Sequence, residues 1–364
     1  MTQRPVVAVL FGGRSSEHGV SCVTAGGVLG AIDRSAWDVV AIGITRDGRW
    51  TLASADPADW RIVDGEMPSV PDAGHTVLPP SHVGAGGWRV LEDSGEARAL
   101  GTIDVVFPVL HGPFGEDGTV QGALELVDVR YVGSGVLGSA IGMDKQFMRA
   151  AFVDAGLPVT DAVVLLPGQD VGSRRGAIVA LGLPVFVKPA RAGSSMGISR
   201  VDTYEALDAA IAGAAKHDPK VLIERAVVGR EIETAVLGTV DGPRTSLPGE
   251  IVTGGDHVFY DFDAKYLDES HVQLLCPADL PSATIERVRD IAAAAFQAIG
   301  GESLARVDVF VGGDGTITVN EINTMPGFTP TSMYPRMWAA TGVDYPELVS
   351  TLLETALNRP VGLR

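Results

Sequence analysis

The residues with the clearest chemical meaning lie in LARVDVFVGGDGTITVNEIN (304–323), where polar and apolar side chains alternate. GGDG (312–315) is typical of a turn, so this segment is predicted to form a hairpin in which 306 lies opposite 321 and 308 opposite 319. Side chains alternate along a strand, so one face of the hairpin is polar and the other enters a core. The polar face carries Arg306, Asp308, Glu321 and Asn323.

Two carboxylates and an amide on one face would suit a hard cation. Diagonal neighbours in a hairpin lie about 7–8 Å apart at the backbone, so their oxygens can converge. Mg²⁺ prefers oxygen ligands, and two Mg²⁺ ions about 3.5–4 Å apart would clamp a triphosphate. The alternative is a solvated sheet face on which Arg306 pairs with Glu321. The polar loop NTMPGFTPTSM (323–333) follows directly and favours a binding site.

A lysine and a glycine-serine loop indicate a phosphate site. Lys188 lies in the apolar strand PVFVKPA (184–190), where an ammonium group is costly unless an anion meets it. The loop AGSSMG (192–197) then offers backbone N–H groups, two hydroxyls and glycines that permit close approach. The pattern GxxxxGK[ST] is absent, which argues against P-loop chemistry. The alternative is a flexible surface turn beside a lysine that extends to solvent.

Three further patterns carry weaker signals. Glu224 and Glu231 flank RAVVGR, where carboxylates would accept hydrogen bonds from ribose hydroxyls; surface charge is the alternative. FGGRSSEHGVS (11–21) follows a strand but lacks GxGxxG, so an NAD site is only weakly indicated. HGPFGEDG (111–118) places an exposed histidine and two acids at a strand end, where parallel sheets bind ligands. A structural role for His111 is the alternative.

The elements that must position these residues fall into an α/β part and an α+β part. Unbroken apolar runs predict buried parallel strands at 6–11, 38–44, 103–110 and 129–134. Residues 52–100 are rich in Pro, Gly, Ser and Asp and are predicted to form loops and short hairpins. Outside that region, helices are predicted at 143–155, 203–215 and 283–299, with strands at 184–190 and 220–227.

Composition bounds the functional class. The 364 residues suffice for two or three domains, and the formal net charge is −17. No Lys/Arg block offsets this acidity, so neither nucleic acid nor an anionic membrane is an expected partner. There is no apolar run of about 20 residues and no signal-peptide pattern. Cys22 and Cys276 are too few for a disulfide framework, so a cytoplasmic location is expected.

Seven blocks in order resemble the D-alanine–D-alanine ligases of the ATP-grasp superfamily, across essentially the whole chain. They are FGGRSSEHGVS, HGPFGEDGTVQG, GSGVLGSAIGMDK, FVKPARAGSSMGISR, VFYDFDAKY, LARVDVF and VNEINTMPGFTPTSMYP. Each block is modestly specific, and the ordered set is very specific. The resemblance implies a Rossmann-like domain (1–144) and two ATP-grasp subdomains (145–228 and 229–364) that grip ATP. It also implies ligation of two D-alanines through a D-alanyl phosphate, for peptidoglycan precursor synthesis, and a homodimer.

The resemblance further implies roles for particular residues. Those that would hold ATP are Lys145 and Lys188 at the phosphates, Glu224 and Glu231 at the adenosine, and Lys265 at the γ-phosphate. Those that would ligate two Mg²⁺ ions, or Mn²⁺, are Asp308, Glu321 and Asn323. Those that would act on the first D-alanine and the oxyanion are Glu17, Ser194, Tyr266 and Arg306. Those that would surround the second D-alanine are His111, Gly327 and Ser332.

The segment VFYDFDAKY bears on the second substrate and on closure of the site. Related ligases that make D-alanyl-D-lactate typically lack the tyrosine matching Tyr266, so its presence favours an amine nucleophile. Gly254 and Gly255 are candidate hinges of a lid that would exclude water. One departure from the family is Ala192, where some members carry an acid. The alternatives are D-serine or D-lactate as second substrate, another ATP-grasp carboxylate–amine ligase, or a non-catalytic ATP-binding protein.

Overall fold

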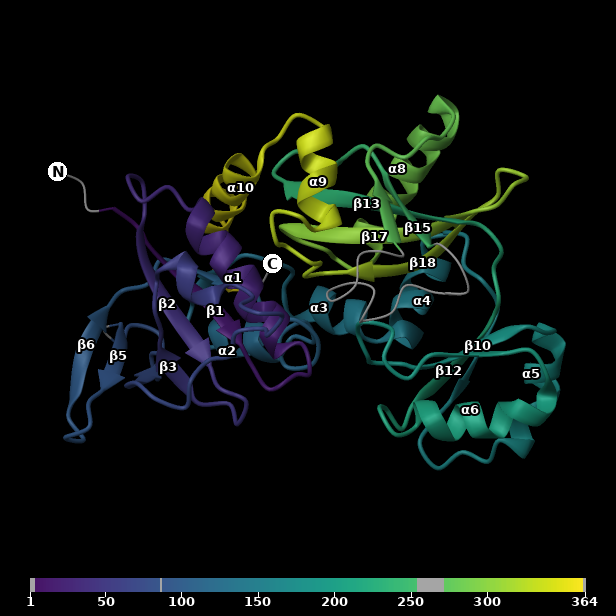
Figure 1. Ribbon diagram of the computed structural model, residues 1–364, viewed down its shortest axis with the longest axis horizontal. Coiled ribbons are helices and arrows are strands. Elements are labelled where there is room, and N and C mark those ends of the chain that lie inside the picture. The colour runs from purple at the N-terminus through teal and green to yellow at the C-terminus, as the bar shows by residue number, and fades with distance from the viewer. Residues whose placement is uncertain (1–3, 86, 254–271, 363–364) are drawn as a thin grey trace.

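Three β-sheets, each with its own helices, make up the computed structural model, which describes residues 4–85, 87–253 and 272–362 (Figure 1). Lys265, Tyr266, Gly254 and Gly255 lie outside the described residues. The first sheet has the order β6-β5-β4-β3-β2-β1-β7-β8. Its strands are β1 (Val6–Gly12), β2 (Asp38–Ile44), β3 (Trp50–Leu52), β4 (Thr76–Leu78), β5 (Trp88–Leu91), β6 (Ala97–Gly101), β7 (Val105–Pro108) and β8 (Arg130–Tyr131).

The first sheet is parallel on one side and antiparallel on the other. Strand β1 pairs in parallel with β2 and β7, and β7 pairs in parallel with β8, as the apolar runs predict. Strands β3 to β6 continue the sheet as an antiparallel meander. The prediction of loops and short hairpins at 52–100 was therefore incomplete, because these short strands extend the parallel sheet. Glycines and prolines interrupt them too often for a long strand signal.

Helices cover both faces of the first sheet. Alternate residues of β1 divide between the two cores: Val7, Val9 and Phe11 face one side, Ala8 and Leu10 the other. Helix α1 (His18–Ala31) covers the first side together with the C-terminal helix α10 (Tyr345–Leu357), and α2 (Thr119–Glu125) covers the second. The chain thus returns to its first sheet at its end (Figure 1). The domain limits at 144 and 228 stay a prediction.

The second sheet is antiparallel, with the order β11-β10-β12-β9. Its strands are β9 (Ala162–Leu165), β10 (Val185–Pro189), β11 (Ser199–Val201) and β12 (Val221–Arg225). Helices α5 (Arg175–Leu181) and α6 (Leu207–Ala214), with the short 3-10 helices η2 (Gly172–Arg174) and η3 (Tyr204–Ala206), lie on the face where Val185 and Val187 are buried. Strand alternation therefore turns Phe186 and Lys188 to the opposite face, which lines a cavity.

The third sheet has the order β16-β15-β13-β17-β18, with β14 paired to β13. Its strands are β13 (Arg230–Thr239), β14 (Gly242–Thr245), β15 (Gly249–Thr253), β16 (Val272–Leu275), β17 (Leu304–Val311) and β18 (Ile317–Asn323). Helix α8 (Ser282–Ala298) covers the face on which Val307, Val309 and Ile322 are buried, so the predicted apolar face of the hairpin is confirmed. Helix α9 (Met333–Ala340) packs on the other side, beside Ala235 and Leu237.

The hairpin register differs from the predicted one. Arg306 lies opposite Asn323 and Asp308 opposite Glu321, two residues further along β18 than predicted. The turn accounts for one residue of this shift, because the N–H of Gly312 bonds to the carbonyl of Thr316. A bulge beside Asp308 contributes the second. Because the two shifts add to an even number, all the polar residues stay on the predicted face.

Two helices join the first sheet to the second. They are α3 (Val136–Met143) and α4 (Lys145–Asp154), while the 3-10 helix η1 (Pro57–Trp60) packs on α1. The sequence predicted one helix at 143–155, whereas α3 ends at Met143 and α4 begins at Lys145. In α4 the buried residues are Met148 and Phe152, and Phe147 is 56% exposed. None of the described helices combines the length and apolarity that crossing a membrane would require.

Candidate active site

Two adjoining cavities collect the predicted site residues. The first, of about 470 Å³, lies between the second and third sheets. The second, of about 430 Å³, lies between loops of the first sheet and the segment that follows β18. Predicted residues that line the first are Lys145, Lys188, Ser194, Glu224, Glu231, Asp308, Glu321 and Asn323. Those that line the second are Glu17, His111, Ser194, Arg306, Asn323, Gly327 and Ser332.

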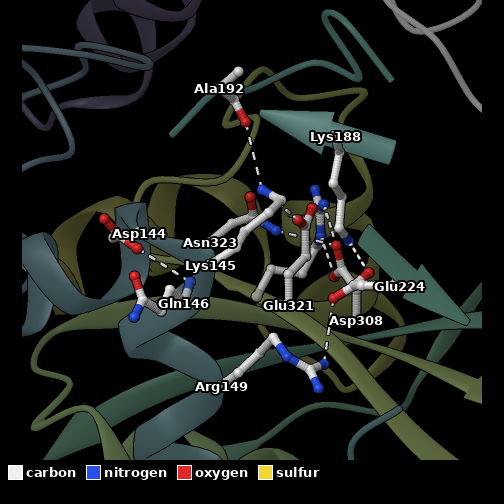
Figure 2. Close-up of polar contacts among 11 residues, drawn as sticks. Asp144, Lys145, Gln146, Arg149, Lys188, Ala192, Glu224, Asp308, Glu321 and Asn323 are labelled. Atoms are coloured by element: carbon white, nitrogen blue, oxygen red, sulfur yellow. Dashed lines mark hydrogen bonds and ion pairs between the residues drawn. The ribbon is translucent and has the colours of Figure 1, made fainter. Parts of the chain in front are cut away.

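Opposite charges meet across the first cavity (Figure 2). Lys188, on β10, forms a buried ion pair with Glu224 on the neighbouring strand β12, and Arg149 of α4 lies 3.3 Å from the same carboxylate. Lys145 Nζ lies 3.0 Å from Glu321 Oε2 of β18. Burial acts to lower the pKa of Lys145, but the charge and hydrogen bond of Glu321 outweigh it and raise that pKa. Lys145 is therefore charged, and both lysines lie where they can exchange carboxylate partners for phosphate.

The position of Lys145 is fixed by the start of α4. Asp144 caps this helix by accepting a 3.1 Å hydrogen bond from the backbone N–H of Gln146. Lys220 forms a buried ion pair with Asp144. The backbone N–H of Lys145 also donates to the carbonyl of Ala190, at the end of the second sheet. Helix α4 and the second sheet therefore hold both lysines in one framework.

Arg306 is enclosed by carboxylates on the polar face of the hairpin. Its Nε and Nη2 lie 2.7 Å and 2.6 Å from the two oxygens of Asp308, and its Nε lies 3.1 Å from Glu233 Oε1 on β13. The shifted register puts Asn323, rather than Glu321, opposite Arg306, and the close ion pairs of the arginine are with Asp308 and Glu233. Burial lowers the pKa of Arg306, but the charges of Asp308 and Glu233 outweigh it, so the pKa rises well above its ordinary value.

The donor set on this face fits a hard cation. Asp308, Glu321 and Asn323 offer carboxylate and amide oxygens, and Asn323 Nδ2 lies 3.0 Å from Asp308 Oδ2. Within the described residues, no three His, Cys, Asp or Glu side chains converge into a preformed metal site. Asp308 and Glu321 instead hold the cations of Arg306 and Lys145. A metal ion bound here would therefore replace side-chain cations on carboxylates that are already close together.

Glu17 lies where three loops meet. Ser194 donates a 2.5 Å hydrogen bond to its Oε1 from the loop after β10. A Cβ added at Gly193 would lie 2.9 Å from its Oε2, and one added at Gly112 would lie 2.8 Å from the same atom. Ser194 itself has the left-handed φ of 48°, a strained conformation that directs its hydroxyl at Glu17. The sequence grouped these residues only through the family resemblance.

His111 is buried, only 4% exposed, so the prediction of an exposed histidine was wrong. Its Nδ1 lies 3.1 Å from the carbonyl of Met325, and its Nε2 lies 3.3 Å from Thr24 Oγ1. A carbonyl only accepts hydrogen bonds, so Nδ1 carries the proton and Nε2 accepts from the threonine hydroxyl. Burial lowers the pKa of His111, although the charge of Glu17 opposes this effect. A neutral His111 thus joins the loop after β7 to the segment after β18.

The segment after β18 closes the second cavity. Gly327 and Ser332 both line it, as predicted. Ser332 stands at the N-terminal end of α9, and its hydroxyl lies 2.7 Å from the hydroxyl of Thr329. Phe328 is fully buried and packs on Phe107 of the first sheet, with ring centroids 5.8 Å apart. This packing anchors the loop against the first sheet.

Two functional candidates were not selected from the sequence. Glu116 accepts hydrogen bonds from the backbone N–H of Gly112 and of Met325, at 2.6 Å and 3.2 Å, and it lines both cavities. Glu233 is 2% exposed and holds Arg306 from the neighbouring strand. The alternation of Glu231 and Glu233 in an otherwise apolar strand was the available signal for Glu233.

Lysines and carboxylates face each other between two antiparallel sheets, and an α/β domain with parallel central strands lies beside them. This arrangement defines an ATP-grasp ligase. Family models described as "D-ala D-ala ligase N-terminus" and "D-ala D-ala ligase C-terminus" match residues 6–134 and 151–354. The chain belongs to the D-alanine–D-alanine ligase family.

Similar proteins cover the whole chain. A D-alanine–D-alanine ligase of Kineococcus radiotolerans is 58% identical, with 99% of each chain covered. One of Pseudarthrobacter chlorophenolicus is 57% identical, covering 99% of this chain and 96% of the relative. The structure of the VanG D-Ala:D-Ser ligase from Enterococcus faecalis superposes with a TM-score of 0.84 at 32% identity, covering 97% of this chain and all of that one. The D-alanine–D-alanine ligase of Coxiella burnetii gives 0.82 at 31% identity, with 98% and 95% covered.

Proposed function

We propose that this protein joins two D-alanines into D-alanyl-D-alanine at the expense of ATP, for peptidoglycan precursor synthesis. The observation that carries the proposal is the convergence of the predicted ATP, metal and amino-acid residues on two adjoining cavities that share Ser194 and Asn323. Full-length relatives named D-alanine–D-alanine ligase support the same reaction.

In the first step the carboxylate of the first D-alanine attacks the γ-phosphorus of ATP, giving D-alanyl phosphate and ADP. Glu17 would hold the ammonium of this D-alanine, with its carboxylate oriented by Ser194. Lys145 and Lys188 would leave Glu321 and Glu224 to bind phosphate oxygens, and Glu224 and Glu231 would then accept hydrogen bonds from the adenosine. Positioning and charge compensation of this kind provide most of the catalysis in phosphoryl transfer.

Asp308, Glu321 and Asn323 would hold two Mg²⁺ ions, which when bound neutralise charge on the triphosphate. Lys265, from the segment outside the described residues, would reach the γ-phosphate. Mn²⁺ would suit the same oxygen ligands.

In the second step the amine of the second D-alanine attacks the acyl carbon and phosphate leaves. Arg306 would stabilise the tetrahedral oxyanion, an effect typically worth about 3–4 kcal/mol for one such donor. Glu233 and Asp308 hold the guanidinium from two directions, so it is oriented before substrate arrives. His111, Gly327 and Ser332 would shape the pocket of the second D-alanine, and Tyr266 would join Ser194 and Glu17 from the lid.

Three broader features belong to the same proposal. We propose domain limits of 1–144, 145–228 and 229–364, a homodimer, and a cytoplasmic location. The limits rest on the division into three sheets, although α10 packs on the first. The dimer and the location rest on family resemblance and on the paucity of cysteines.

The proposal is tested by phosphate release from ATP and Mg²⁺ with D-alanine, with L-alanine and without amino acid, followed by mass analysis of the product. We expect D-alanine-dependent release and a dipeptide. D-Serine and D-lactate, each added with D-alanine, would measure the selectivity of the second site. ATP binding without D-alanine-dependent release from folded protein would instead support a non-catalytic role.

A further inference from the structure

Glu116 stands where the two cavities meet, on a loop between the first sheet and α2. It is partly buried, and it lines both the nucleotide cavity and the amino-acid cavity. Backbone N–H groups of Gly112 and Met325 bond to Oε2 and Oε1, so each carboxylate oxygen is held in place from a different loop. Each oxygen retains a second lone pair for another donor.

The amino-acid cavity is lined by the carboxylates of Glu17, Glu116 and Glu233. Glu233 lies 3.1 Å from the guanidinium of Arg306, and Glu17 is the proposed partner of the first ammonium group. For Glu116, the described part of the chain places no cation within ion-pair distance, and its two donors are neutral amides. The charges of Arg306 and Lys145 act on Glu116 only from a longer distance, so a carboxylate that faces the cavity without a direct ion pair favours a cationic ligand.

The surroundings of Glu116 identify which substrate group is concerned. Met325 belongs to the segment that carries Gly327 and Ser332, where the second amino acid would bind. Glu17 is occupied by Ser194 and lies against the glycines of the two neighbouring loops. Burial, and then the charge of Glu17, raise the pKa of Glu116 to about 8, as is expected for a carboxylate that awaits a positive partner.

We propose that Glu116 binds the ammonium group of the second amino acid and so directs its nitrogen toward the acyl group. This inference rests on the proposed function, and it assigns the specificity for an amine over a hydroxy acid partly to Glu116. The loops of Gly112 and Met325 hold the carboxylate in place, while the ammonium supplies the missing charge.

The test compares two nucleophiles in Glu116→Gln. Hydroxylamine is uncharged at neutral pH and traps D-alanyl phosphate as a hydroxamate without needing an ammonium site. We expect hydroxamate formation within about 3-fold of wild type, while the KM for the second D-alanine rises about 10–100-fold, the range for loss of a charged hydrogen bond. Glu116→Asp, which keeps the charge, should recover most of that loss.

Asp117 provides a matched control in the same loop. Its carboxylate also accepts two backbone hydrogen bonds, from Phe114 and Thr119, each at 2.9 Å, but it lines neither cavity. Asp117→Asn should leave the KM for the second D-alanine within about 3-fold of wild type. The proposal would be overturned if the KM for the second D-alanine rises equally in both variants, or if it is unchanged in Glu116→Gln. It would also be overturned if Glu116→Gln loses hydroxamate and dipeptide formation equally.

The proposed function and this inference fail in different ways. If wild-type protein makes no dipeptide, the proposed function is wrong; if it does and Glu116→Gln behaves like wild type, only the inference is wrong.

Thermal unfolding checks that the Glu116→Gln variant folds. Should it not fold, D-lactate is tested as a competitor of the second D-alanine in wild type and in Glu116→Asp. The proposal is supported if the inhibition constant of D-lactate in wild type is at least 10-fold higher than the KM of the second D-alanine and if this ratio is smaller in Glu116→Asp. It is overturned if the two constants are equal in wild type.

Discussion

The hydroxyl of Ser194 donates a 2.5 Å hydrogen bond to the carboxylate of Glu17, across 177 positions of sequence. Glu17 precedes α1 on the first sheet, whereas Ser194 lies on the loop after β10 of the second. This bond therefore joins two sheets at the point where the first amino acid would bind. The glycine beside Ser194 lets the two loops approach, since a Cβ at Gly193 would lie 2.9 Å from Glu17 Oε2.

Gly193→Ala should weaken binding of the first D-alanine. The added methyl group would press on the Glu17 carboxylate, so that Glu17 or the loop must shift. We expect the KM for the first D-alanine to rise about 10-fold, because a misplaced binding group loses much of a charged hydrogen bond. Initial rates over a wide D-alanine range, fitted with two binding sites, measure this. Gly176→Ala, with nothing within 4 Å of its Cβ, is the control, and an equal change there would contradict the argument.

Arg306→Ala should reduce both turnover and stability. Turnover should fall about 10²–10³-fold through loss of the oxyanion donor. Removal of the guanidinium also leaves Asp308 and Glu233, each 2% exposed, without their cation, which typically costs about 3–5 kcal/mol. Single-turnover kinetics and urea unfolding separate the two effects. Arg287→Ala is the control on α8, where the side chain is exposed and donates to the carbonyl of Gly315. Near-normal turnover in folded Arg306→Ala would exclude the oxyanion role.

The sequence predicted the polar face of the hairpin but not its register. The face depends only on strand alternation, and the alternation survives because the turn and the bulge beside Asp308 together shift the pairing by two. Turn geometry and bulges depend on local backbone conformation, which residue types leave open. For this reason Asn323, and not Glu321 as the predicted register had it, lies opposite Arg306.

Contacts between distant loops were outside the reach of sequence patterns. Glu116 bonds to Met325, 209 positions away, and His111 is buried against the same residue. A polar residue in a loop is predicted to be exposed, because its sequence does not show which distant loop covers it. The family resemblance supplied most of the site for this reason, whereas the contacts of Glu116, one of the two acids of HGPFGEDG, and the position of Glu233 beside Arg306 emerged only from the structure.

Glu321→Gln should raise the Mg²⁺ concentration that gives half-maximal ADP formation by at least about 10-fold, since it removes a charged oxygen ligand. Thermal stability should change little, because Lys145 keeps a nearby acceptor in the carbonyl of Ala192. Titration with Mg²⁺ after treatment with EDTA measures the effect in both proteins. Glu286→Gln, which removes an exposed pair with Arg289 on α8, is the control. An unchanged Mg²⁺ requirement would remove Glu321 from the proposed ligands.

The stability of the protein should depend on pH through Glu116. Its pKa is raised to about 8 in the folded state by burial and by the charge of Glu17, whereas an unfolded glutamate titrates at about 4.3. The folded state therefore binds the proton more tightly, and unfolding releases it between these two values. This contribution to stability is fully present below the unfolded pKa and is lost as pH rises toward 8.

Glu116→Gln cannot titrate, so it lacks this contribution to the pH dependence. Urea unfolding of both proteins at pH 5, 7 and 8.5 isolates it, because the other groups largely cancel in the difference. We expect the free energy of unfolding of the variant, minus that of wild type, to increase by about 1–3 kcal/mol from the lowest pH to the highest. This is less than the pKa shift of Glu116 would give in full, because the side chain is partly solvated. Parallel stability curves would show that the carboxylate is already ionised in the folded protein near pH 5. In that case the ammonium of the second amino acid would find Glu116 charged at every working pH.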